Sequence, residues 1–180
     1  MNAQLIGLYA PSPGSGKTEV ANALARRGFH SVPFALPLKQ MVASLFSGLG
    51  YGDEEIRSFF HECKEDVVPA FGVSTRHLLQ TLGTEWGRTC VSPDMWLNHW
   101  RIRVRAYSYV VVDDVRFLNE AELIRSMGGV MWRVDRAGHV RTVEHESEGG
   151  LNAWPHFDRY ISNDGTLQQL KDAVAEIPLG

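Results

Sequence analysis

The sequence predicts an α/β fold in which a mostly parallel sheet carries helices on both faces. Short apolar runs alternate with segments of helical periodicity along the chain. Two of these runs, 5–9 and 109–113, are almost entirely apolar, as expected for strands that are buried on both faces. Strands that alternate with helices are joined by crossovers, and crossovers place neighbouring strands in parallel.

Composition and length fit one globular domain, and we expect a single domain over residues 1–180. The chain has a hydrophobic fraction of 44%, a charged fraction of 22% and a formal charge of -3, which gives no electrostatic reason to expect a protein that coats duplex DNA. No apolar run approaches the roughly 18 residues of a membrane span, and the first residues do not resemble a signal peptide. The 2 cysteines are far apart and predict no disulfide framework. We therefore expect a cytoplasmic protein.

The first elements follow from periodicity and from turn residues. The run 5–9 predicts a strand that enters a turn rich in proline and glycine, and residues 18–27 show helical spacing that Gly28 ends. A second short strand is expected over 29–34, and a helix over 37–49.

The middle of the chain is predicted to be helical. Residues 53–66 are rich in charge and indicate a surface helix or an insert. Ser74 is a suitable N-cap for a helix over 75–86, and Ser92 and the following proline predict a helix that runs to about residue 107.

The last third of the chain returns to strands alternating with helices. The run 109–113 predicts a central parallel strand, and the polar segment 135–154, which contains glycine and histidine, predicts a lid. The other expected elements are a helix over 117–127, a strand over 130–134, a strand over 159–161 and a helix over 166–177.

A glycine-containing loop between the first strand and the first helix predicts a polyphosphate site. Gly14, Ser15 and Gly16 would present main-chain N–H groups to phosphates at a helix N-terminus. Lys17 would reach the β- and γ-phosphates, and the Thr18 hydroxyl would bind Mg²⁺. The loop and its flanking elements predict a three-layer P-loop NTPase fold.

The loop departs from the usual pattern G-x-x-x-x-G-K-S/T at its first position, where this chain has Pro11. Proline has no N–H and cannot adopt a positive φ, so we expect the loop to begin with a different backbone conformation. Phosphate binding by itself does not specify a reaction, because many NTPases share this loop.

Two acids end the strand over 109–113 and provide candidates for the metal site. Asp113 and Asp114 are adjacent, so in an extended strand they point to opposite faces. The sequence leaves open which of them serves the metal; we assign Asp113 to Mg²⁺ and Asp114 to catalysis. Arg116 follows as a candidate for a phosphate, with Glu120 as the residue that could hold it.

Several segments resemble the bacteriophage deoxynucleoside monophosphate kinases. The order of the matching segments is the same from the phosphate loop almost to the C-terminus, which makes the set more specific than any one motif. The matching segments are Pro37 to Lys39, Leu78 to Arg88, Asp113 to Ala121, His145 to Glu148 and Ile161 to Leu167.

This resemblance implies a five-stranded parallel sheet, an acceptor-binding insert over about 37–105 and a lid over about 135–154. It implies transfer of the γ-phosphoryl group of ATP, with Mg²⁺, to a deoxynucleoside monophosphate, which gives ADP and a deoxynucleoside diphosphate. The substrate is then the expected partner, and a homodimer is left open.

Cations and aromatic residues are the candidates for the acceptor, because phosphoryl transfer depends on positioning and on charge neutralisation. Arg136 is a candidate for the transferred phosphoryl group on lid closure. Trp86 is weighed with Trp96 as a partner for the base, although aromatic residues at helical spacing more often belong to a core. The expected acceptor-binding residues are Lys39, Arg76, Gln80, Arg88, Trp96 and Glu148.

Three other functions remain open from the sequence. One is a kinase that phosphorylates a modified, hydroxymethylated base within phage DNA, which the basic residues Arg101, Arg103 and Arg105 support weakly. Another is a small-molecule kinase similar to dephospho-coenzyme A kinase, which the segment 78–88 argues against. The last is a nucleotide-binding switch, which needs no acceptor pocket and therefore leaves the lid and its arginines unexplained.

Overall fold

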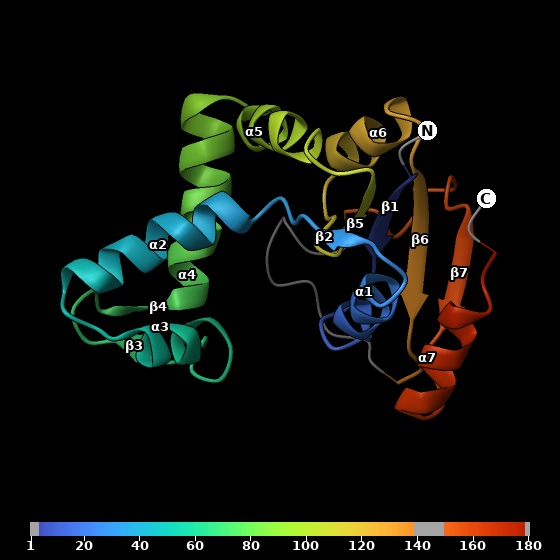
Figure 1. The fold of residues 1–180 in the computed structure, drawn as a ribbon. Helices are drawn as coiled ribbons and strands as arrows, with labels where there is room; N and C mark the ends of the chain where they lie inside the picture. Colours follow the sequence, from blue (N-terminus) through green and yellow to red (C-terminus); the bar gives the residue numbers. More distant parts are fainter. Residues whose placement is uncertain (1–3, 139–149, 179–180) are drawn as a thin grey trace. The chain divides into compact units, whose positions relative to one another are not determined.

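The computed structural model describes residues 4–138 and 150–178 (Figure 1). It contains two compact units. The first, which we call the sheet unit, comprises Met1–Phe34 and His99–Gly180, and the second, the helical unit, comprises Ala35–Asn98.

The sheet unit contains a five-stranded parallel sheet, which confirms the predicted fold class. Strand order is β2-β5-β1-β6-β7, so the strand that precedes the phosphate loop lies in the centre. Because every pair is parallel, the carboxyl ends of all five strands lie at one edge, where α/β proteins bind ligands. The strands are β1 Gln4–Tyr9, β2 His30–Ser31, β5 Tyr109–Val112, β6 Val130–Asp135 and β7 Arg159–Ser162.

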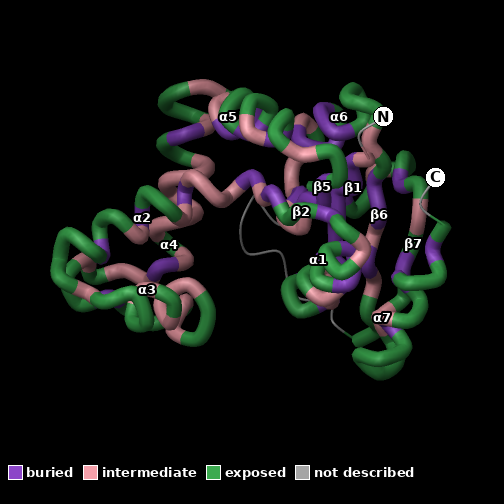
Figure 2. Tube along the Cα trace, viewed as in Figure 1, coloured by how far each residue is buried: buried purple, intermediate pink, exposed green. Residues whose placement is uncertain are grey.

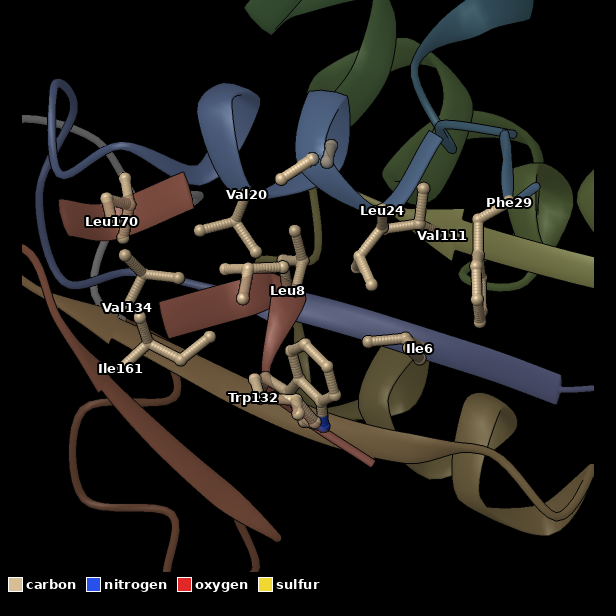
Figure 3. Packing of buried hydrophobic residues seen from close by; sticks show 14 of the residues in the cluster. Ile6, Leu8, Val20, Leu24, Phe29, Val111, Trp132, Val134, Ile161 and Leu170 are labelled. Atoms are coloured by element: carbon tan, nitrogen blue, oxygen red, sulfur yellow. The ribbon is translucent and has the colours of Figure 1, made fainter. Parts of the chain in front are cut away.

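Alternation of side chains along β1 divides the sheet unit into layers. Ile6 and Leu8 point to the face that carries α1 (Lys17–Ala25) and α7 (Leu167–Ala175), where a large apolar cluster forms (Figure 3). The residue between them, Gly7, faces α6 (Leu118–Ser126), and a Cβ there would lie 2.8 Å from Ile124 Cδ1. Helices therefore cover both faces, as the sequence predicts.

The buried ring of Phe46 packs against other aromatic rings in the helical unit. Phe46 on α2 (Leu36–Gly48) is fully buried and lies 4.9 Å from the ring of Phe59 on α3 (Asp53–Phe60). The other elements are the hairpin of β3 (Val67–Val68) and β4 (Val73–Ser74), the helix α4 (Thr75–Gln80), a π-helix (Thr81–Val91) and the start of α5 (Met95–Val104). Along α3, exposed and intermediate positions occur together (Figure 2), and none of its residues is fully buried.

Several element boundaries differ from the sequence-based expectation. Ser74 caps its helix as predicted, with its Oγ accepting the N–H of His77 at 3.2 Å. The helix does not end near residue 86, however, but continues to Val91 with π-helical hydrogen bonding from Thr81. The expected strand over 29–34 is reduced to His30–Ser31, and the helix expected from Ser92 begins at Met95.

No helix within residues 4–138 or 150–178 has the length and the apolar character needed to span a membrane.

Candidate functional site

The phosphate loop follows the central strand and runs directly into α1. Gly14 and Gly16 have φ values of 79° and 98°, in the left-handed region that glycine adopts without strain. The N–H groups of Gly14, Ser15 and Gly16 have no hydrogen-bond acceptor among the described residues. Unpaired main-chain donors at the N-terminus of a helix form an anion site.

Hydrogen bonds from side chains fix this loop, one from a residue of the loop itself and two from distant parts of the sequence. Ser15 is buried, and its hydroxyl donates to the carbonyl of Ser12 at 2.8 Å. Asn163 Nδ2 donates to the carbonyl of Ser15 at 3.0 Å, and Arg136 Nη1 donates to the carbonyl of Gly14 at 3.3 Å. The loop is thus attached to the segments that follow β6 and β7.

The first residues of α1 place the expected donor-site side chains beside the loop. Lys17 is the first residue of the helix and is half-buried, and Thr18 follows it with an exposed side chain. Both lie at the carboxyl edge of the sheet, as the strand–loop–helix order requires.

The two acids lie at the same edge because β5 pairs with β1. Val112 is opposite Gly7 in this pairing, so Asp113 and Asp114 follow next to the end of β1. Asp114 Oδ1 accepts the main-chain N–H of Phe34 at 2.9 Å, which ties the segment after β2 to the end of β5. Asp113 is half-buried.

Glu120 organises the chain around Arg116 through the main chain. Its carboxylate is almost fully buried and accepts the N–H groups of Arg116 at 2.7 Å and of Phe117 at 3.1 Å. The second of these bonds satisfies the main-chain N–H of Phe117, the N-cap residue of α6, as the glutamate at N3 does in a capping box. The expected link between Glu120 and Arg116 therefore includes the peptide N–H of the arginine.

The stem of the expected lid contacts the end of β1. Arg133 Nε donates to Asp135 Oδ1 at 2.9 Å, and its guanidinium lies 6.0 Å from the centre of the Tyr9 ring. The Tyr9 hydroxyl donates to Asn152 Oδ1 at 2.7 Å. Burial raises the pKa of the Tyr9 phenol above its ordinary value. Residues 139–149, which include the expected site residue Glu148, lie outside the described residues.

The acceptor candidates lie in the helical unit, on different elements. Lys39 is on α2, and Arg76 and Gln80 share α4. Arg76 forms an ion pair with Glu65, and Arg88 on the π-helix donates from Nη1 to the carbonyl of Pro93 at 3.2 Å.

The two tryptophan candidates differ in exposure. Trp96 is 4% exposed and its indole N–H donates to the carbonyl of Gly83 at 2.8 Å, so it packs inside the helical unit. Trp86 is 42% exposed, and its ring centre lies 6.3 Å from that of Trp96. Of the two, Trp86 presents a ring surface to solvent.

Trp86 lines an apolar groove that the sequence analysis did not identify. The groove has a volume of about 400 Å³. Its walls come from α2, α4 and the π-helix. The sequence indicates the apolar residues of each helix, but it does not indicate how the three helices pack together. The lining residues are Val42, Leu45, Leu78, Thr81, Leu82, Glu85, Trp86 and Cys90.

The phosphate loop after the central strand, with two acids after the neighbouring strand, defines a protein of the P-loop NTPase fold class. A solved structure supports the fold: the crystal structure of TT1252 from Thermus thermophilus matches with a TM-score of 0.51 at 16% identity, covering 97% of this chain and 96% of that one. The family model "Deoxynucleotide monophosphate kinase" matches residues 52–174. This chain belongs to the deoxynucleotide monophosphate kinase family.

Viral and phage relatives agree with this assignment. A putative deoxynucleotide monophosphate kinase of Acanthamoeba polyphaga mimivirus is 32% identical over 184 residues, which cover 94% of this chain and 93% of the relative. The deoxynucleotide monophosphate kinase of Escherichia phage RB69 is 28% identical, covering 76% of this chain and 57% of its own length. The deoxynucleoside-5′-monophosphate kinase of Escherichia phage T5 is 34% identical, covering 57% and 43%. The matches to the two phage enzymes thus span about half of those proteins.

Proposed function

We propose that this protein transfers the γ-phosphoryl group of ATP to a deoxynucleoside 5′-monophosphate and releases ADP and the diphosphate. One observation supports the proposal: in a chain of this family, a loop with two positive-φ glycines also joins the carboxyl end of the central strand to a helix N-terminus. The family model begins at residue 52, after the loop, so the sequence match and the loop geometry are independent.

The sheet unit would bind the donor. The N–H groups of residues 14–16, which have no acceptor within residues 4–138 and 150–178, would bind phosphate oxygens. Lys17 would neutralise charge that develops on the transferred group. Such donors are effective because they are oriented before the substrate arrives.

Thr18 and Asp113 fit Mg²⁺ by their chemistry. Both supply hard oxygen atoms, the kind of ligand that Mg²⁺ prefers. No group of three or more His, Cys, Asp or Glu suited to a metal occurs within residues 4–138 and 150–178. A sparse protein ligand set is typical of Mg²⁺ that is held mainly by substrate phosphates and water. When bound, the ion would neutralise phosphate charge.

Asp114, Arg116 and Arg136 would complete the reacting region. Asp114 holds the chain at Phe34, so we assign it a positioning role at the end of β5. Arg136 lies beside the phosphate loop through its bond to Gly14, which supports its assignment to the phosphoryl group. Arg116 is fixed at its main chain by Glu120 and would contact phosphate through its guanidinium.

The helical unit would bind the acceptor. Lys39, Arg76 and Arg88 supply positive charge for the acceptor phosphate, and Gln80 lies one helical turn after Arg76. The apolar groove would take the base against Trp86, because a flat heterocycle stacks on an exposed indole.

The remaining acceptor-site candidates, Trp96 and Glu148, rest on different kinds of evidence. Because the ring of Trp96 is almost completely covered, we assign it a structural role: its indole N–H donates to the carbonyl of Gly83 and fixes the π-helix that lines the groove. The proposal for Glu148 rests on the sequence resemblance alone. We expect the enzyme to act in the cytoplasm, where ATP and free nucleotides are available.

The test is ADP release by the purified protein with ATP and Mg²⁺. The acceptors are the four deoxynucleoside monophosphates, their ribose counterparts, dephospho-coenzyme A and DNA with hydroxymethylated bases. Turnover on free deoxynucleotides supports the proposal, and turnover on DNA alone contradicts it. We expect Lys17→Ala to lower the rate by at least about 10²-fold while the circular dichroism spectrum stays unchanged. Wild-type rates in this variant would contradict the assignment of the loop.

A further inference from the structure

We propose that Asn163 is a positioning residue that orients the Ser15–Gly16 peptide for phosphate binding. The inference rests on the proposed use of ATP, but it concerns binding of the donor and not transfer to the acceptor. Asn163 lies in the segment between β7 and α7, far from the phosphate loop in the sequence.

Asn163 contacts the loop at one defined peptide. Its Nδ2 donates to the carbonyl of Ser15 at 3.0 Å. A Cβ on the next residue, Gly16, would lie only 2.4 Å from the same Nδ2, so the amide group lies directly against the loop backbone. The contact therefore fixes both the direction of the carbonyl and the space next to it.

Peptide geometry transmits this contact to a donor for phosphate. In a trans peptide the carbonyl and the N–H of the following residue point in opposite directions. Because Asn163 holds the carbonyl of Ser15, the N–H of Gly16 must point away from Asn163. Arg136 acts in the same way on the preceding peptide, because it holds the carbonyl of Gly14 and so orients the N–H of Ser15.

The two oriented N–H groups are available for a ligand. Within the described part of the chain, neither Ser15 N–H nor Gly16 N–H has an acceptor. Rotation of either peptide would replace a donor by a carbonyl oxygen, which repels phosphate. The side chain of Asn163 thus favours the orientation in which the loop binds anions.

Asn163 can perform this role because its own segment is fixed at several points. Its N–H donates to the carbonyl of Asp135 at 2.8 Å and extends the pairing of β7 with β6. Asp164 accepts the N–H of Ala137 and the hydroxyl of Ser162. Thr166 caps α7, with its hydroxyl oxygen accepting the N–H of Gln169 at 3.2 Å.

An alternative role for Asn163 would be direct contact with the nucleoside part of ATP. The two roles predict different results with inorganic tripolyphosphate, which has the phosphates of ATP without adenosine. A positioning residue of the loop affects both ligands, whereas a residue that contacts the nucleoside affects ATP alone.

The experiment compares Asn163→Leu and Asn163→Ala with wild type by calorimetric titration of ATP and tripolyphosphate. Leucine keeps the approximate shape of asparagine but has neither a hydrogen-bond donor nor an acceptor. Asn98→Ala on the exposed side of α5 is the matched control. We expect both dissociation constants to rise about tenfold in the Asn163 variants, as for one lost hydrogen bond that orients a charged ligand. The KM for ATP should rise in parallel, while the KM for the acceptor stays within about twofold.

Unchanged tripolyphosphate affinity in either folded Asn163 variant overturns the inference, as does a wild-type protein that binds neither ligand. Wild-type protein that binds both ligands but transfers no phosphoryl group would refute the proposed function and leave the role of Asn163 standing. If the Asn163 variants fail to fold, a second measurement on the wild-type protein still tests the inference. The amide resonance of Gly16 should shift on addition of tripolyphosphate, and an unchanged resonance at saturation also overturns the inference.

Discussion

Replacing Gly87 by alanine tests how the π-helix is packed against Trp96. In an ordinary helix this change stabilises the protein by about 1 kcal/mol, because alanine has the higher helix propensity. Here a Cβ on Gly87 would lie 2.5 Å from Nε1 and Cζ2 of the Trp96 indole. The ring is rigid and only 4% exposed, so it cannot move aside into solvent.

The magnitude follows from three contributions. Overpacking of a core typically costs about 1–3 kcal/mol. Displacement of the indole would also break its bond to the Gly83 carbonyl, and a buried polar group without a partner costs about 1–3 kcal/mol. These costs exceed the gain in propensity of about 1 kcal/mol, so we expect Gly87→Ala to lower the free energy of unfolding by about 1–5 kcal/mol.

The assay is urea unfolding followed by circular dichroism, with Gly48→Ala as the matched control. Gly48 is the last residue of α2, its φ is negative, and a Cβ there would meet no atom within 4 Å. The control should be unchanged or stabilised by up to about 1 kcal/mol. If Gly87→Ala were as stable as Gly48→Ala, the described packing of Trp96 would be wrong.

Two further predictions concern the sheet unit. Trp100 is 1% exposed, and its indole N–H donates to the carbonyl of Val32 at 2.7 Å. Trp100→Phe removes this donor and should lower the free energy of unfolding, measured in urea, by about 1–3 kcal/mol. An unchanged free energy of unfolding would contradict the hydrogen bond. Burial raises the pKa of Tyr9, so the folded protein holds the phenol proton more tightly than the unfolded chain does. The resulting contribution to the free energy of unfolding is present below about pH 10 and is lost as the pH rises further. The urea midpoint should therefore fall more between pH 8 and pH 10.5 in wild type than in Tyr9→Phe, and equal falls would exclude this role of Tyr9.

The phosphate loop could be predicted from the sequence because its determinants are local. A buried strand, two glycines with positive φ and a helix N-terminus follow one another within a few residues, and each has its own residue preferences. The cap at Ser74 was predictable for the same reason, since an N-cap depends on the three residues that follow it.

The π-helix and the groove were not predictable in this way. The N-cap at Ser74 indicated a helix over 75–86, but the change of hydrogen bonding at Thr81 accompanies close packing of Gly83 and Gly87 against Leu38 and Trp96. These contacts join residues from separate helices, and no local preference encodes them.

The hydrogen bond from Asn163 to the phosphate loop could not be predicted from the sequence for a related reason. Asn163 and Ser15 are 148 positions apart, and the sequence gives Asn163 the appearance of an ordinary turn residue before a helix. Only the parallel pairing of β6 with β1 and β7 brings its segment to the edge at which the loop lies.

The prolines of the phosphate loop have a consequence for the entropy of nucleotide binding. The rings of Pro11 and Pro13 restrict φ at two positions of a short loop, and Ser15 closes the same loop through its bond to Ser12. A flexible loop loses conformational freedom when it closes around a polyphosphate, and that loss weakens binding. In this protein the two proline rings remove part of that freedom before any polyphosphate binds.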